Sequence, residues 1–257
     1  MSGALLVHLL AFVCLSGLLW LLQLSLQKRW PALQAQPGFY LLLALLSLTA
    51  WLPLPQFDHS WPVPLALLQE TSWQWQQLQA VPEHPSLRVT QQWHRANYLL
   101  LLLAVVAVFG LIRLTCQQLK LKRLITNATL LQGQSWLPDW PDSVQLRLFD
   151  GQSSAFATGI RQPLVMIPAY LVQLPTAQRH LLLRHELLHL QQRDPQVLFG
   201  WRVLLAICWF NPFLRLWYRA WQQATELRVD LQVCQTTNPA LYASTLLQCL
   251  KLDQQQQ

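Results

Sequence analysis

Residues 185–189 read His-Glu-Leu-Leu-His, a pattern that can hold a metal ion and carry out acid–base chemistry beside it. On a helix, positions i and i+4 lie one turn apart on the same face, so His185 and His189 can offer imidazole nitrogens to one zinc ion. Glu186 lies beside them and can take a proton from a water that the zinc activates. The pattern predicts a zinc hydrolase site; ordinary histidines on a helix surface are the alternative interpretation.

A catalytic zinc site needs a third protein ligand, which leaves one position for water. Glu226 is the strongest candidate, and an ordinary exposed carboxylate on a helix is the alternative. Asp230 follows one helical turn later, where it could hydrogen-bond a ligating histidine and support it. Asp194 follows His189 too closely to be a strong ligand candidate. Its position favours a helix cap or a pair with Arg193 or another neighbour, behind the metal ligands.

The composition is that of a membrane protein. Of the 257 residues, 53% are hydrophobic and 11% are charged, whereas about 25% are charged in a typical soluble domain. Within a membrane domain over 1–115, the segments 3–26, 38–54 and 97–114 are long and apolar enough to cross a bilayer. The net charge of +7 could indicate nucleic acid. However, the basic residues are scattered beside apolar runs, so we expect no direct nucleic-acid binding.

The distribution of Lys and Arg orients these spans. Basic residues occupy the 27–37 link and the chain after the third span, whereas the 55–96 loop has few of them and offsets these with acids. The positive-inside rule therefore places the N-terminus and this loop outside and the chain from residue 116 inside. The first span lacks a basic start and a clear cleavage site, which indicates a retained anchor. The five cysteines form no Cys-x-x-Cys pair, which indicates reduced, mostly buried thiols.

Residues 116–257 form a predicted catalytic domain. A helix is predicted over 117–131, and a half-buried strand over 144–149, where apolar and polar residues alternate. Residues 154–168 predict two short strands around a turn, and their prolines favour the edge of a sheet, since proline cannot donate to a ladder. Helix resumes at Pro175 and carries the two histidines.

A further apolar stretch, 197–221, separates the histidines from Glu226. A single crossing there would place Glu226 on the far side of the bilayer, where it could not reach the metal. The most apolar part covers about 21 Å, less than a ~30 Å hydrocarbon core, and Arg202 interrupts it. Asn211-Pro212 then breaks the helix. We therefore expect an interfacial helix over 197–221 that dips into or lies along the inner leaflet.

The motifs of the catalytic segment resemble those of the BlaR/MecR family of integral-membrane zinc metallopeptidases. They are His185-Glu-Leu-Leu-His189, Arg193-Asp194-Pro195, Trp209-Phe-Asn-Pro212 and Glu226-x-x-x-Asp230, preceded by Gly159-Ile-x-x-Pro163 and Ile167-Pro168. The resemblance implies a membrane α-helical protein with three transmembrane helices and a small α+β gluzincin-type metallopeptidase domain. It implies that His185, His189 and Glu226 bind one Zn²⁺. It also implies that Glu186 is the catalytic base and that Asn211 lies behind the ligands.

The predicted strands and the orientation of the spans, together with the resemblance, lead to an expected substrate and location. The predicted edge strand would bind an extended protein or peptide substrate by strand addition, through Ala155, Phe156, Ala157, Thr158 and Gly159. The site would act at the cytoplasmic face of the bacterial inner (cytoplasmic) membrane, in signalling or in regulation of a transcriptional repressor. The expected partners are this substrate, the lipid bilayer and a second copy of the chain in a homodimer.

Two departures from the family limit what it implies. The chain ends at Gln257 without a fourth span or a sensor domain, so beta-lactam sensing is not expected. Position 229 is Val where the family has Cys, at a position that is not a ligand. Ser154–Gly159 is also similar to Ste24/HtpX-type membrane proteases, which makes a quality-control protease one alternative. A non-catalytic membrane transducer that kept the fold is the other.

Overall fold

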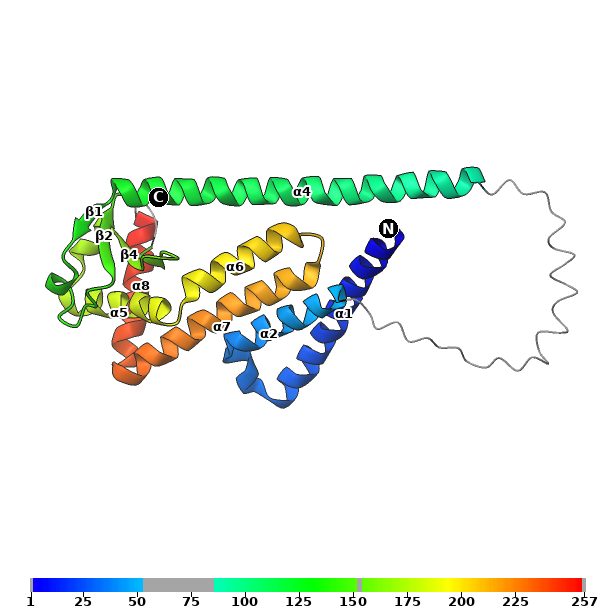
Figure 1. Ribbon diagram of the computed structural model, residues 1–257. Coiled ribbons are helices and arrows are strands. Elements are labelled where there is room, and N and C mark those ends of the chain that lie inside the picture. The colour runs from blue at the N-terminus through cyan, green and yellow to red at the C-terminus, as the bar shows by residue number, and fades with distance from the viewer. Residues whose placement is uncertain (1, 53–85, 152–153, 256–257) are drawn as a thin grey trace, which may run out of the picture.

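The computed structural model describes residues 2–52, 86–151 and 154–255. Its helices are α1 (Ser2–Arg29), α2 (Pro37–Ser47), α4 (Ser86–Asn127), α5 (Thr176–Gln191), α6 (Asp194–Ile207), α7 (Pro212–Thr236) and α8 (Pro239–Gln255). Its strands are β1 (Thr129–Leu131), β2 (Gln145–Phe149), β3 (Phe156–Thr158) and β4 (Leu164–Pro168), and short 3-10 helices are η1 (Pro31–Ala35), η2 (Leu48–Trp51), η3 (Gly133–Ser135) and η4 (Ala169–Gln173). In Figure 1, α4 runs the length of the molecule, with the sheet, α5 and α8 at one end.

Two helices in the described part of the chain are long and apolar enough to cross a membrane: Leu5–Arg29 and Asn97–Asn127. The segment predicted as a second span, 38–54, is a shorter apolar helix that ends with η2 at Trp51. The 11 residues of α2 rise about 16 Å, roughly half of a ~30 Å hydrocarbon core. Residues 53 and 54 lie outside the described residues.

The helix α4 is continuous over 42 residues, about 63 Å. The separate helix predicted over 117–131 is therefore the end of α4, which stops at Asn127 and gives way to β1. The predicted boundary between residues 115 and 116 falls inside this helix, so one element links the apolar span to the sheet. The last part of the predicted 55–96 loop is helical, because residues 86–96 belong to α4. Residues 55–85 lie outside the described residues.

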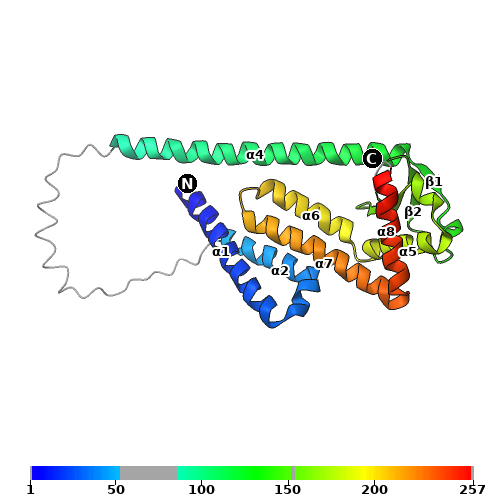
Figure 2. The ribbon, with the colours of Figure 1, turned by 180° about the vertical axis from the view of Figure 1, so that it is seen from behind.

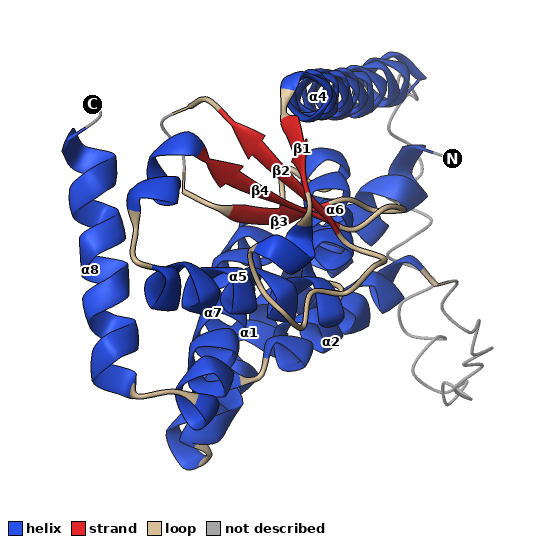
Figure 3. Cartoon of the chain, turned by 90° about the vertical axis from the view of Figure 1, so that its left-hand side faces the viewer, coloured by secondary structure: helices blue, strands red, loops and turns tan. Residues whose placement is uncertain are grey.

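Four strands form one sheet in the order β1-β2-β4-β3. The central strands β2 and β4 are parallel, and β1 and β3 pair antiparallel with them. The edge position predicted for residues 154–168 is correct for β3 and wrong for β4, whose residues are all buried. A central strand tolerates these prolines because Pro163 precedes β4 and Pro168 ends it. The helices α5 and α4 lie on opposite sides of the sheet (Figure 3), and their apolar side chains pack on its two faces.

The single interfacial helix predicted over 197–221 is not observed. The helices α6 and α7 form an antiparallel hairpin instead (Figure 2). The predicted break is present, because Asn211 caps α7 by accepting a hydrogen bond from the Phe213 N–H (3.1 Å). The chain then reverses, since both helices have apolar faces to bury: Trp201 and Trp217 lie in one core shared with α1 and α2. A single helix lying along the membrane surface could not bury both faces.

The tip of this hairpin reaches the middle of both long helices. The Asn211 side-chain amide donates to the Ser16 hydroxyl of α1 (2.8 Å). The Trp209 indole N–H donates to the Leu103 carbonyl of α4 (3.3 Å). Both acceptors lie within the apolar helices, so the hairpin packs alongside them.

Candidate metal centre

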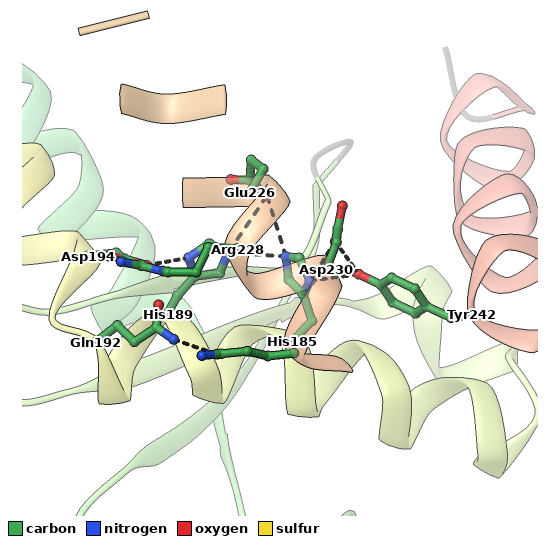
Figure 4. Close-up of polar contacts among 9 residues, drawn as sticks. His185, His189, Gln192, Asp194, Glu226, Arg228, Asp230 and Tyr242 are labelled. Carbon is green, nitrogen blue, oxygen red and sulfur yellow. Dashed lines mark hydrogen bonds and ion pairs between the residues drawn. The ribbon is translucent and has the colours of Figure 1, made fainter. Parts of the chain in front are cut away.

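The helices α5 and α7 bring three potential metal ligands together (Figure 4). His185 and His189 project from one face of α5, and their Nε2 atoms lie 3.1 Å apart. Glu226 faces them from α7, with its Oε2 atom 3.5 Å from the Nε2 of His185 and 3.7 Å from that of His189. The structure thus brings together all three residues that the sequence predicts as ligands.

The spacing of these atoms fits a tetrahedral zinc ion. Bonds of about 2.0–2.1 Å at tetrahedral angles place two ligand atoms about 3.3 Å apart. The observed separations of 3.1, 3.5 and 3.7 Å lie on both sides of that value. A calcium ion would need six or more oxygen ligands, whereas two of these three donors are nitrogen. The donor set therefore fits zinc.

The protonation of the two histidines also favours a cation between them. The Nδ1 atom of His189 lies 2.8 Å from Asp194 Oδ2, so it carries the proton that this carboxylate accepts. The Nδ1 atom of His185 lies 2.7 Å from the Tyr242 hydroxyl, which itself donates to Asp230 Oδ1 (2.6 Å). Both Nε2 atoms then present lone pairs to the same point. Two lone pairs at 3.1 Å repel each other, so a cation has to lie between them, either a metal ion or a proton.

The pKa values describe the protonated form of the site, in which a proton on the His189 Nε2 atom takes the position of the metal. Burial by itself would lower the pKa of His189, but hydrogen bonds with Asp194 and Glu226 raise it to about 9. Hydrogen bonds from the two histidines hold the pKa of Glu226 well below its usual range. Burial and the hydrogen bond to Asp230 raise the pKa of Tyr242 above its usual range, so its hydroxyl keeps its proton. The site is therefore built to attract positive charge.

A buried ion pair supports the histidine side of the site. Asp194, at the start of α6, is 7% exposed, and both of its oxygens accept from Arg228 Nη2, at 2.7 and 2.9 Å. Arg228 lies on α7, two residues after Glu226, so Asp194 bonds both to α7 and to His189 of α5. Of the alternatives expected for Asp194, the pair with Arg193 is not observed: Arg193 is the N-cap residue before α6 and has the left-handed backbone conformation, with φ of 58°.

Glu186 lies on α5, as His185 and His189 do, and lines the cavity beside the metal ligands. Burial raises the pKa of Glu186 to about 7, although the two histidines and a hydrogen bond from the Ala157 backbone N–H act to lower it. A carboxyl group with a pKa near neutrality can accept a proton and release it again at physiological pH.

The metal ligands open onto a cavity of about 550 Å³. One wall is the edge of the sheet, and most of the remainder is apolar. The cavity is lined by Ser154, Ala155, Phe156, Ala157, Tyr170, Leu171, Leu182, His185, Glu186, His189, Asp194, Pro195, Leu198, Trp221, Gln222, Thr225, Glu226, Leu246 and Cys249. Of the five residues predicted to bind substrate, the first three are in this lining, and Thr158 and Gly159 are not. Gly159 instead makes the turn into β4, with φ of +100°.

Asn211 does not lie at the site, contrary to the expectation from the sequence. It is fully buried in the hairpin turn, where it contacts Ser16 and caps α7. The 14 residues of α6 carry the chain about 21 Å away from Asp194 before this turn. Asn211 therefore stabilises the hairpin that returns Glu226 to the histidines.

Two residues of the site carried no signal in the sequence. Arg228 lies close to Glu226 but belongs to no recognisable motif. Tyr242 is on a different helix, α8, and meets His185 across a separation of 57 residues. Only the packing of α8 against α5 and α7 brings it there.

Apolar helices of membrane-spanning length, joined to a cavity with this metal-ligand set, define a membrane-associated metallopeptidase. The sequence model of the BlaR1 peptidase M56 family matches residues 5–257, and the chain belongs to that family. This confirms the resemblance to the BlaR/MecR proteins. A comparison with curated protein sequences found no match.

Proposed function

We propose that the protein is a zinc endopeptidase that cleaves a protein substrate at the cytoplasmic face of the bacterial inner membrane. The observation that carries the proposal is the convergence of His185, His189 and Glu226 at zinc spacing, beside Glu186 and an edge strand. Zinc held there would lower the pKa of a water molecule and polarise the carbonyl of the scissile bond. By likeness to the family, a transcriptional repressor is the substrate we favour.

The chain's own residues supply the remaining steps. Glu186 accepts a proton from the attacking water at its carboxylate and passes it to the nitrogen of the leaving amine. Among the described residues, β3 has a strand neighbour on one side only, which leaves its other side for an extended peptide. Ala155 and Ala157 line the cavity with small side chains, so that a peptide backbone can approach closely.

The direction of the helices supports a topology with three crossings. The helix α7 runs alongside α1 in the same direction: beyond the Asn211–Ser16 contact, the Trp217 indole N–H donates to Gln23 Oε1 (2.6 Å). The helix α6 runs antiparallel to α4. Ala206 of α6 lies beside Gly110, whereas Trp209, three residues later, contacts Leu103, which comes earlier in α4. Because α6 and α7 are themselves antiparallel, α1 and α4 point the same way.

Two helices that point the same way require a return crossing between them. The helix α2 and η2 run back along α1: Gln27 Nε2 donates to the Tyr40 hydroxyl (2.9 Å), and the Ala50 carbonyl lies 2.9 Å from His8 Nδ1. These contacts lie near opposite ends of α1. They support the predicted second span, although α2 by itself is short.

The α6–α7 hairpin is proposed to enter the bilayer and return on the same side. From Ser16 to Arg29, the basic end of α1, the helix rises about 20 Å. From Leu103 to Arg113 on α4 it rises about 15 Å. The tip would therefore reach roughly the middle of a ~30 Å hydrocarbon core. This path returns Glu226 to the side of the histidines, as one shared metal requires.

The test compares the wild-type protein with Glu186→Gln and Glu226→Ala in lipid nanodiscs. Zinc content is measured on each, and cleavage of a peptide library is read by mass spectrometry. Glu186→Gln should keep about one zinc per chain and lose roughly 10²–10⁴-fold in cleavage rate, the usual contribution of a general acid–base. Glu226→Ala should lose both zinc and activity. Undiminished cleavage by Glu186→Gln would refute the base assignment, and a zinc-loaded but inactive wild type would favour the transducer.

A further inference from the structure

The hydroxyl of Tyr242 connects His185 to Asp230. It lies 2.7 Å from His185 Nδ1 and donates to Asp230 Oδ1 at 2.6 Å. The direct separation between His185 Nδ1 and Asp230 Oδ1 is longer, at 3.4 Å. The Tyr242 ring also stacks on the imidazole, with centroids 6.3 Å apart and planes at 29° (Figure 4). Tyr242, more closely than Asp230, therefore determines how His185 is held.

This chain of contacts fixes which ring nitrogen of His185 carries the proton. The Tyr242 hydroxyl has one proton, and Asp230 accepts it. Its oxygen can then only accept from His185, so Nδ1 must be the protonated nitrogen. The Nε2 atom is left with its lone pair directed at His189 Nε2 and Glu226 Oε2, where the metal would bind.

Tyr242 cannot act on a substrate directly. It is 3% exposed, and it is not among the residues that line the cavity. It lies in an apolar cluster with Leu181 of α5 and with Val229 and Val233 of α7. Any effect on the reaction must therefore pass through His185.

We propose that Tyr242 is a positioning residue that sets the tautomer and ring orientation of His185, and that α8 is thereby a required part of the metal site. The inference rests on the proposed zinc site. It adds that α5 and α7, which carry the three ligands, are not sufficient for tight zinc binding. A third helix, α8, completes the site.

The test measures zinc affinity of the full-length protein by competition with a chromogenic chelator. Tyr242→Phe keeps the ring and removes the hydroxyl, and it should weaken zinc binding about 10- to 100-fold, as is typical for partners of metal-bound histidines. Ser244→Ala is the matched control on α8, because Ser244 is exposed and bonds only to the Leu241 carbonyl of its own helix. It should bind zinc as the wild type does. Affinity of Tyr242→Phe within twofold of wild type would overturn the proposal.

A second variant tests the same proposal if Tyr242→Phe fails to fold. Asp230 is 40% exposed at its side chain, so Asp230→Ala does not disturb the core. Without its acceptor, the Tyr242 hydroxyl can turn its proton towards His185 Nδ1, which selects the wrong tautomer and should also weaken zinc binding about 10-fold or more. Unchanged affinity in Asp230→Ala would likewise count against the proposal.

Cobalt substitution separates positioning from loss of a ligand. At saturating Co²⁺, the visible absorption of Tyr242→Phe should match that of the wild type, because the three ligands are intact. A spectrum that instead matches Glu226→Ala would overturn the positioning role. If the wild type itself binds neither zinc nor cobalt, the proposed function fails. If the wild type and the Tyr242 variant bind zinc equally well, only the positioning role of Tyr242 fails.

Discussion

At the scale of single residues, the site depends on partners that hold its ligands from behind. His189 is fixed by Asp194 and His185 by Tyr242, and in each case the hydrogen bond to Nδ1 directs Nε2 at the metal position. Asp194 has a second role, because its bond to Arg228 joins the start of α6 to α7, the helix that carries Glu226. Neither Asp194 nor Tyr242 has to touch the metal in order to determine its affinity.

Replacement of Asp194 by Asn should weaken zinc binding about 10- to 100-fold, because the amide holds the His189 N–H less strongly and no longer neutralises Arg228. Zinc affinity is measured by chelator competition. The matched control is Asp150→Asn, since Asp150 is an exposed residue after β2. Equal affinities for the two variants would show that the Asp194 contact does not support the ligand.

At the scale of elements, the hairpin is the part that makes the site possible. The helix α6 leaves the histidines, and α7 returns to them with Glu226, so the packing of α6 on α4 and of α7 on α1 and α2 sets the position of that ligand. The helices α4 and α6 approach closely at Gly110, where an added Cβ would lie 3.3 Å from the Ala206 carbonyl oxygen.

Gly110→Leu should therefore separate α4 from α6 and destabilise the protein by roughly 1–3 kcal/mol, the usual cost of overpacking. Gly200→Leu is the matched control, because Gly200 is on α6 and has no atom within 4 Å of an added Cβ. Both changes gain the same helix propensity, so the comparison isolates the contact. Thermal unfolding in detergent, followed by tryptophan fluorescence, measures the difference. A melting temperature of Gly110→Leu at or above that of Gly200→Leu would contradict the assigned packing.

At the scale of the whole molecule, α4 is one uninterrupted helix that connects the apolar span to the sheet beside the metal site. Its apolar part begins at Asn97, and Leu124 and Ile125 in its last turns pack directly on the sheet. The side of the membrane that holds the sheet is thus set by the direction of α4. By the positive-inside rule, the basic residues near this end predict that it lies in the cytoplasm, as the proposed topology requires.

Cysteine reporters test this orientation in a background without the five native cysteines. Ser60→Cys, in the predicted outer loop, should react with a membrane-impermeant maleimide in intact spheroplasts. Ser135→Cys, which is exposed after β1, should react only after permeabilisation. Equal reaction of both after permeabilisation is the control for accessibility. The reverse pattern would invert the proposed topology.

Much of the site follows from the sequence because its spacing is local. The i, i+4 relation of His185 and His189 holds on any helix, and the requirement for a third ligand makes Glu226 the strongest candidate. The first and third apolar spans and the strand over 144–149 also follow from composition and alternation over short windows, although β4, taken for an edge strand, is central.

The tertiary structure decided what depends on contacts between distant segments. No periodicity distinguishes a helix along the membrane surface from a hairpin, because the difference lies in whether α1, α2 and α4 cover its faces. The same holds for Asn211, which the sequence placed at the site and the fold places at the hairpin tip. It holds most clearly for Tyr242, which meets His185 only because α8 packs across α5 and α7. A motif specifies which side chains can bind a metal, whereas the packing of remote helices decides what holds those side chains in place.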